Sequence, residues 1–298
     1  MSLLHLEMQY INQSTFSTGV FRKLTVISFG IASVLVFVSA TVRAQDAKPV
    51  LTTETRPTAE SVAKAEQIVA RATEVVGGSN YVNVKTVLGR GFYTGFLDGI
   101  PQLPSRFVDY ISFPDRERTE FVSSGIRTIQ TNSGDTGWLF DGATKTITDM
   151  RPEQVQDFKK GMRTSVENLL QGWWRKEGAT LSYVGRREAG LAKRNEVVRL
   201  TYPEGFWIEY EFGAKDSLPA KMIYKRSKKK IDSDEVVETS EEDRIAKTMN
   251  LDGITAAWII DHYINGVQTS RINYESIEYN KPFADTLFAK PASVKALK

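Results

Sequence analysis

RFVDYISFPDRERTEFVSSGIRTIQTNSGDTGWLFDG, residues 106–142, decides the fold class, because short runs of alternating polar and apolar residues follow one another with brief turns between them. The runs cover 106–113, 118–121, 127–131 and 136–140, and the breaks are rich in the turn residues Pro, Asp, Ser and Gly. Strands joined by so few residues pair antiparallel, since a parallel crossover needs a dozen or more residues. The segment therefore predicts an antiparallel meander.

The same strand pattern continues on both sides of this meander. Residues 84–96 predict a strand that is bent or bulged near Gly89 and Gly91. Further strands are predicted at 181–185, 195–201, 206–212 and 220–225. The last two, at 256–264 and 267–279, meet at Asn265-Gly266, a dipeptide typical of a tight hairpin turn.

Two segments have helical rather than strand periodicity. Residues 58–76 place apolar side chains three and four positions apart, and Gly77-Gly78 ends the helix. Pro152–Lys176 predicts a second helix that carries large apolar residues, including Met162, Leu169 and Trp173. Core packing explains most of these side chains; whether Trp173 and Trp174 line an open cavity is left undecided by the pattern.

Residues 225–244 combine a basic run with an acidic one. The sequence is basic from Lys225 to Lys230 and acidic from Asp232 to Asp243. Charge runs usually form a solvated surface, so we expect a long solvated hairpin or loop whose two halves attract one another. A docking surface is the alternative.

The N-terminal 44 residues have the pattern of a secretory signal peptide. Arg22 and Lys23 precede an apolar run of 17 residues, 24–40, and Val42-Arg43-Ala44 fits a signal peptidase site. A retained anchor is the alternative, although the run is shorter than the roughly 20 residues of a spanning helix. Because Gln45 rather than cysteine follows the cut, no lipid attachment is expected there. Residues 45–57 are expected to form a flexible lead-in to an exported, soluble protein.

The remaining chain is poor in catalytic chemistry. Cleavage after Ala44 leaves 36 basic and 35 acidic residues, a net charge of +1, which argues against nucleic acid as a partner. With no cysteine and only His262 left, the usual metal sites and thiol chemistry are excluded, and we expect no metal and no cofactor. A hydrogen-bonded or surface strand histidine is favoured over a catalytic one, with Asp261 on the opposite strand face. Paired carboxylates stay open, but the sequence does not predict an enzyme.

Four segments, spread over most of the remaining chain, resemble one family. Residues 277–291, IEYNKPFADTLFAKP, are similar to the closing motif of the periplasmic outer-membrane lipoprotein-sorting, LolA-like carriers. Residues 134–142, GDTGWLFDG, resemble the family's Asp-Gly turn and Trp strand. Residues 114–118, PDRER, and 216–221, DSLPAK, resemble its Pro-x-x-x-Arg segment and its late Leu-Pro-x-Lys strand.

The resemblance implies a fold and a function. The expected class is α+β, a strongly curved antiparallel sheet (an unclosed β-barrel) with two or more helices over its concave face, formed by a single domain at 58–298. The expected function is a monomeric periplasmic carrier or binder of lipoprotein acyl chains or other lipids, with an envelope membrane protein as a further partner. An envelope protein-interaction or sensor module on the same scaffold is the alternative.

Residues for a hydrophobic cavity can be proposed, although the inward face of each strand is open because a one-residue slip reverses it. One departure from the family concerns Phe113, which stands where the well-studied carriers have an arginine implicated in holding the lid closed. Such a latch therefore cannot be carried over. The cavity candidates are Phe92, Phe107, Trp138, Phe140, Met162, Leu169, Trp173, Trp207 and Trp258.

Overall fold

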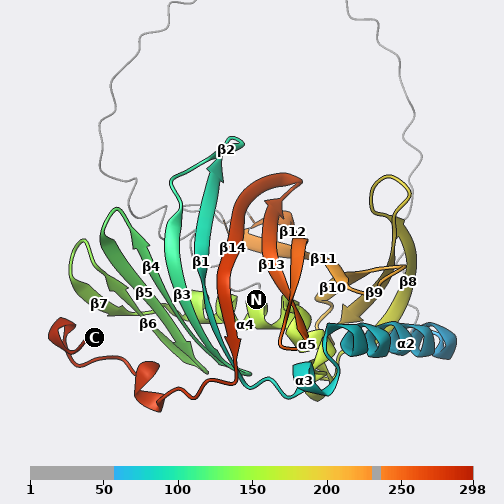
Figure 1. The fold of residues 1–298 in the computed structure, drawn as a ribbon, viewed down its shortest axis with the longest axis horizontal. Helices are drawn as coiled ribbons and strands as arrows, with labels where there is room; N and C mark the ends of the chain where they lie inside the picture. The colour runs from blue at the N-terminus through green and yellow to red at the C-terminus, as the bar shows by residue number, and fades with distance from the viewer. Residues whose placement is uncertain (1–56, 230–235, 298) are drawn as a thin grey trace, which may run out of the picture.

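A large antiparallel sheet forms the body of the computed structural model, which describes residues 57–229 and 236–297 (Figure 1). Its strands are β1 (Thr86–Leu97), β2 (Ile100–Pro101), β3 (Ser105–Ser112), β4 (Arg116–Ser123), β5 (Ile126–Ser133), β6 (Thr136–Asp141), β7 (Thr146–Asp149), β8 (Thr180–Glu188), β9 (Arg194–Thr201), β10 (Trp207–Gly213), β11 (Pro219–Lys229), β12 (Val236–Leu251), β13 (Ile254–Ile264) and β14 (Val267–Tyr279).

The strand order makes this sheet an open, curved wall. It runs β7-β6-β5-β4-β3-β1-β14-β13-β12-β11-β10-β9-β8, with the short β2 paired to β1 outside this path. The first and last strands of the order, β7 and β8, are not paired with each other, so the barrel is unclosed. The predicted α+β class and the antiparallel meander are confirmed.

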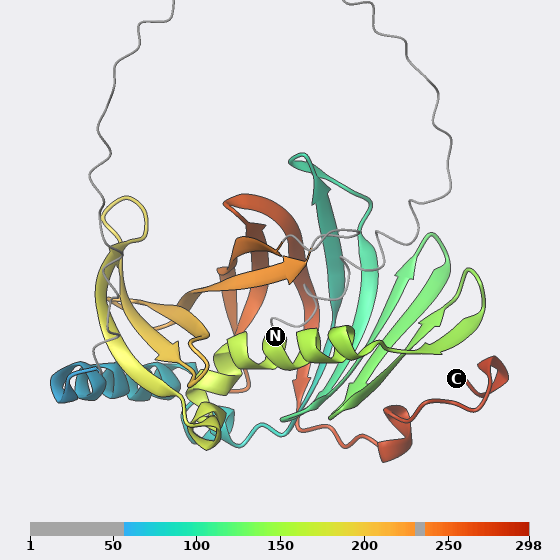
Figure 2. The ribbon, with the colours of Figure 1, turned by 180° about the vertical axis from the view of Figure 1, so that it is seen from behind.

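Helices cover the hollow side of this wall (Figure 2). They are α2 (Ala59–Val76), α3 (Ser79–Val82), α4 (Pro152–Thr164) and α5 (Val166–Leu170), followed by the 3-10 turn η1 (Trp173–Glu177). Two further 3-10 turns, η2 (Asp285–Leu287) and η3 (Val294–Ala296), belong to the C-terminal segment. Helix α2 confirms the predicted helix: the Thr58 hydroxyl accepts the backbone N–H of Ser61, and Gly77 ends the helix at φ 140°.

The second predicted helix is wrong in its continuity. The chain leaves helical geometry at Ser165, whose ψ is 147°, and restarts as α5. The Ser165 hydroxyl accepts the backbone N–H of Asn168 at 3.1 Å and so caps the new helix. The apolar periodicity continues across residue 165, so the sequence pattern did not indicate the helix break that the local capping bond creates.

The described part of the acidic run, from residue 236 on, belongs to strand β12, which forms a hairpin with β11 and not a loop. Strand β12 pairs with β11 from Arg244↔Lys221 to Val236↔Lys229 and with β13 on its other side. The expected attraction between the two halves is present as an ion pair of Lys225 and Glu238 at 2.5 Å. The high charge made a central strand look like a solvated segment. The strand is stable in the sheet because its buried carboxylates are paired with partners on neighbouring strands.

The predicted irregularity in the first strand is confirmed. The register of β1 against β14 shifts between Arg90 and Gly91, which marks a β-bulge. The proposed signal peptide at 1–44 and nearly all of the lead-in at 45–57 lie outside the described residues. In the part of the chain that is described, no helix is long and apolar enough to cross a membrane.

Candidate functional site

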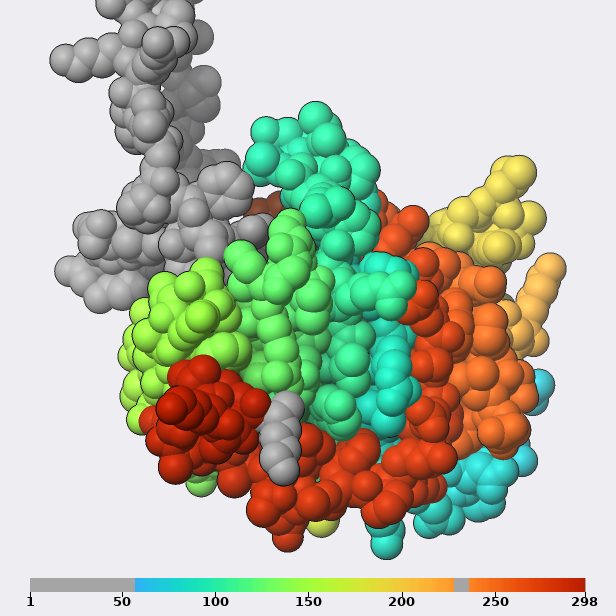
Figure 3. Space-filling model, turned by 60° about the vertical axis from the view of Figure 1, so that its left-hand side comes forward, coloured from blue at the N-terminus to red at the C-terminus, as the bar shows by residue number. Residues whose placement is uncertain are grey.

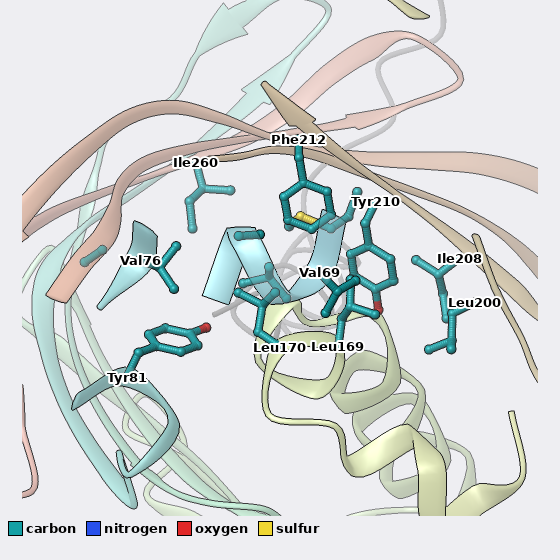
Figure 4. Close-up of a cluster of buried hydrophobic side chains, with 14 of the residues drawn as sticks. Val69, Val76, Tyr81, Leu169, Leu170, Leu200, Ile208, Tyr210, Phe212 and Ile260 are labelled. Atoms are coloured by element: carbon teal, nitrogen blue, oxygen red, sulfur yellow. The ribbon is translucent and has the colours of Figure 1, made fainter. Parts of the chain in front are cut away.

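The main apolar core lies between helices α2, α3 and α5 and the hollow face of the sheet (Figure 4). Val69 and Val76 of α2 and Leu169 of α5 are buried there. Strands β9, β10 and β13 supply the opposite side of the core, with Leu200, Ile208, Tyr210, Phe212 and Ile260. The stripe of small and β-branched residues on α2 thus seats that helix against the sheet.

A cavity opens beside this core, where α3 and α5 meet strands β1 and β11–β14. Its volume is about 40 Å³. The lining is mostly aliphatic and aromatic, and it consists of Val76, Tyr81, Val84, Val87, Phe113, Val166, Glu167, Gln171, Leu218, Pro219, Met222, Ile245, Thr248, Thr255, Ala256, Ala257, Ile260 and Tyr279.

The size of this cavity defines the state of the site. A volume of about 40 Å³ holds a few water molecules, whereas pockets that take drug-sized ligands run to roughly 300–1,000 Å³. A ligand of that size would fit only if the helices on one side of the cavity moved away from the sheet.

One polar spot interrupts the apolar lining. Glu167 of α5 is 5% exposed and is the one charged group in the lining. Burial, and secondarily the charge of Glu167, raises the pKa of the Tyr81 and Tyr279 hydroxyls, so both stay protonated. Gln171 lies one helical turn further along. A ligand with an apolar chain and a hydrogen-bonding head would find partners for both parts.

An aromatic contact stands where the family resemblance would have placed a latch. The ring of Phe113, at the end of β3, packs on the ring of Trp173 in η1 with a centroid distance of 5.1 Å. Phe113 also lines the cavity. The link between sheet and helices at this point is thus apolar, and opening it exposes hydrophobic surface rather than breaking a polar bond.

The junction of α4 and α5 is fixed to the sheet. The Tyr210 hydroxyl donates to the Arg163 carbonyl at 3.0 Å, and Asn168 Nδ2 donates to the Tyr202 hydroxyl at 2.8 Å. Helix α4 extends from this anchored point across the hollow side of the sheet (Figure 2). The break at Ser165 therefore separates a long helix from a short, fixed one.

The nine residues proposed from sequence fall into three groups. Phe107 and Leu169 are buried in the main core, and Trp258 packs against that core. Met162 and Trp173 are half-buried on the helical segment. The remaining four lie on the opposite face of the sheet from Phe107. Directly paired residues share a face, and the strand pairings put these four on the face that Phe107 does not share. They are Phe92, Trp138, Phe140 and Trp207.

The aromatic residues on this opposite face are covered by arginine side chains or packed against the C-terminal segment. The Arg106 guanidinium lies 5.0 Å from the centre of the Phe92 ring, and Arg199 covers Trp207 in the same way at 4.8 Å. Trp138 and Phe140 form a second apolar cluster with Ile129, next to the C-terminal segment. Trp138 Nε1 donates to the Phe288 carbonyl at 3.1 Å.

None of the nine is among the residues that line the cavity, and as ligand-binding residues all nine stay predictions. Much of the lining comes instead from aliphatic and small residues of β11–β13, which sequence reasoning passed over in favour of large aromatics. The alternation of Ile254, Ala256 and Ile260 was the signal that could have found this wall.

His262 lies in a buried group of charged residues on the same strands. Its Nδ1 is 2.7 Å from Asp243 Oδ1, and its Nε2 is 3.9 Å from Glu241. Glu241 also pairs with Arg226 at 3.2 Å. Asp261 faces the other way, as predicted, and binds Arg271 at 2.6 Å. Since both imidazole nitrogens face carboxylates, the group is a charge-pairing cluster rather than a base aimed at a hydroxyl. The described residues contain no set of His, Asp and Glu side chains placed to hold a metal.

A buried carboxyl on the hollow face of β3 gives a prediction about pH. Burial raises the pKa of Asp109 from 3.8 to about 6, although Thr119 donates to it at 2.8 Å. A group whose pKa is raised by folding stabilises the protein at low pH, and that stability is lost as pH rises from about 4 through about 6. We expect Asp109→Asn to raise the free energy of unfolding by about 1–3 kcal/mol at pH 7.5 and to change it little at pH 4.

Urea unfolding of wild type and Asp109→Asn at both pH values measures this difference. Asp252→Asn, at an exposed turn, is the matched control and should change stability by less than about 0.5 kcal/mol. A destabilisation of Asp109→Asn that is equal at pH 4 and pH 7.5 would show that the carboxyl is not held protonated.

Comparison with known proteins concerns the fold. No family model and no curated protein matches the sequence. A crystal structure of a DUF1329 family protein from Desulfovibrio piger is similar, with a TM-score of 0.52 and 12% sequence identity over 77% of this chain and 97% of that chain. An unclosed antiparallel sheet with helices over its hollow face is also the architecture expected from the LolA-like motifs. The fold is LolA-like.

Two further structures are similar at TM-scores of 0.48. One is a putative outer membrane lipoprotein-sorting protein domain from Vibrio parahaemolyticus, at 9% identity over 77% of this chain and 96% of that chain. The other is the LolA superfamily protein NE2245 from Nitrosomonas europaea, at 12% identity over 76% and 97%. Likeness at such identities concerns the fold alone.

Proposed function

We propose that this protein is a periplasmic carrier or binder of acyl chains, from lipoproteins or other lipids, that holds its ligand without covalent chemistry. The observation that carries the proposal is the apolar cavity between the α3–α5 helices and the hollow face of the sheet, which contains a single charged side chain, Glu167. An acyl chain needs apolar walls and no catalytic group, and its polar end needs a few hydrogen-bonding partners.

Loading would begin with movement of the helical segment. The contact between Phe113 and Trp173 holds η1 on the sheet, and its release would let η1 and the adjoining end of α5, which lines the cavity, turn away from the sheet about the anchored Asn168. Apolar surface uncovered in this way is covered again by the ligand chain, so opening and binding offset one another.

The remaining parts of the proposal concern the whole chain. Residues 1–44 would direct export and be removed, residues 45–57 would link, and residues 58–298 would form one ligand-binding domain that works as a monomer without cofactor or catalysis. Its partners would be a lipidated protein or a lipid, together with an envelope membrane protein that delivers or receives the ligand.

Native mass spectrometry of the protein purified from the periplasm of an expressing cell tests the proposal. We expect a bound species of discrete mass that lipid extraction identifies as acylated, and mass analysis of the chain also shows whether cleavage follows Ala44. An apo mass combined with no uptake of added fatty acid would reject the carrier function and favour a protein-interaction module on the same scaffold.

A further inference from the structure

Large apolar side chains are exposed on the connection between β1 and β3. Leu97 is 61% exposed, Ile100 is 65% exposed and Leu103 is 72% exposed. The connection projects beyond the rest of the sheet (Figure 1), and in the space-filling view it stands above the neighbouring hairpins (Figure 3). No described element covers these three side chains.

The neighbouring hairpins add to this exposed apolar group. Val122 and Ile126, at the turn between β4 and β5, are 44% and 45% exposed. Val122 lies opposite Arg106 of β3, so this turn and the β1–β3 connection share one edge of the sheet. Val267, at the start of β14, lies on that edge as well, since Gly95 of β1 pairs with Ser270 of β14. Val236, at the start of β12, is on the same edge, since Glu241 of β12 pairs with Ile264 at the end of β13. We call these hairpin ends the apolar rim.

The distribution is informative although single exposed apolar residues are normal. Of the ten large apolar side chains that are strongly exposed in the described part of the chain, seven lie on the apolar rim. The other three, Val82, Val184 and Leu191, lie outside the rim. Apolar side chains gathered on one edge indicate an interaction surface.

Charge is scarce on the β1–β3 connection and on the β4–β5 turn. Residues 96–105 contain one charged residue, Asp98, and residues 121–126 contain none. Arg106, which is exposed, lies at the base of the projection. It is three residues from Leu103, or about 10 Å along an extended strand. A surface that is apolar at its outermost level and cationic about 10 Å further in matches the acyl boundary and the anionic headgroups of a bilayer.

We propose that the apolar rim docks on a lipid surface that contains anionic lipids, with Leu97, Ile100 and Leu103 entering the acyl boundary and Arg106 at the headgroup level. Separate projecting tips suit a fluid interface, which closes around each of them, whereas a folded protein partner would need a matching pit for every tip. The surface is distinct from the acyl cavity, which lies among the helices on the hollow side of the sheet. Docking there places the carrier against a membrane without using the ligand site.

Vesicle flotation tests this proposal with the protein as purified from the producing cell. Vesicles of phosphatidylcholine with one quarter phosphatidylglycerol should bind wild type more tightly than vesicles of phosphatidylcholine alone. The triple variant Leu97→Ser, Ile100→Ser, Leu103→Ser should bind the mixed vesicles at least about ten-fold more weakly, since three apolar anchors are lost. Arg106→Gln should lower binding a few-fold at low salt and less at high salt.

Leu191→Ser is the matched control, because Leu191 is 99% exposed on the turn between β8 and β9, outside the apolar rim. It should bind vesicles as wild type does. Wild-type protein that ignores both vesicles, that binds both equally, or that is matched by the triple variant would overturn the proposal. Uptake of fatty acid measured in the same variants should be unchanged, so failure of docking and failure of the acyl-binding function are told apart.

Discussion

Gly91→Ala is expected to lower the free energy of unfolding by about 3 kcal/mol or more, or to prevent folding. A Cβ atom at this position would lie 2.2 Å from the Asn273 carbonyl oxygen and 2.8 Å from the Tyr274 Cα, both of them backbone atoms of β14. Backbone in a paired strand cannot move aside as a side-chain tip can. The substitution therefore forces β1 and β14 apart at the bulge where the first strand of the chain joins the last.

Gly95→Ala on the same strand is the matched control for this experiment. The nearest atom to a Cβ there is Tyr93 Cε1 at 4.0 Å, and we expect a change within about 0.5 kcal/mol. Urea unfolding followed by circular dichroism compares the two variants with wild type. Equal stability of Gly91→Ala and Gly95→Ala would mean that the β1–β14 junction is looser than its geometry indicates.

Much of this fold could be predicted from local patterns alone. Turn residues located the hairpins, alternation located the strands between them, and Gly77 ended the first helix where the sequence indicated. These features depend on a few neighbouring residues, so one sequence contains them. The bulge beside Gly91 was predicted for the same reason, since glycine within a strand marks a close backbone approach.

The site could not be predicted in the same way, because it depends on which face of each strand turns inward. Phe92 and Phe107 both lie on strands, yet pairing of Phe92 with Arg106 puts them on opposite faces. Trp207 differs from the core residue Ile208 by a single step, and that step separates an arginine-covered surface from the interior. Periodicity gives the alternation of a strand but not its phase relative to the helices.

Charge was misleading for a related reason. The acid-rich segment after residue 235 was expected to be solvated, but Glu241 and Asp243 are buried because Arg226 and His262 on adjacent strands face them. Pairing across strands is a tertiary property, which composition does not record. This buried cluster gives the central strands a fixed register, and the same strands form the cavity wall through Met222, Ile245 and Ile260.

Filling the cavity from the β13 side is the second change with a large expected effect. Ala256 of β13 is 3% exposed and lines the cavity, so a large side chain there would occupy the space of about 40 Å³ and project toward the helices. We expect Ala256→Phe to reduce uptake of the fluorescent fatty acid cis-parinaric acid at least ten-fold while the protein stays folded. Overpacking of this kind costs about 1–3 kcal/mol, which a chain of this size can tolerate.

Ala246→Phe, at an exposed position of the neighbouring strand β12, provides the same substitution outside the cavity and should bind the probe as wild type does. Ala256→Leu should have an intermediate effect, because uptake is expected to fall as the volume left in the cavity falls. Circular dichroism and thermal unfolding confirm that each variant is folded before binding is compared. If folded Ala256→Phe binds the probe with wild-type affinity, the acyl chain does not enter between the helices and β13, and the cavity described here is only a packing defect of the core.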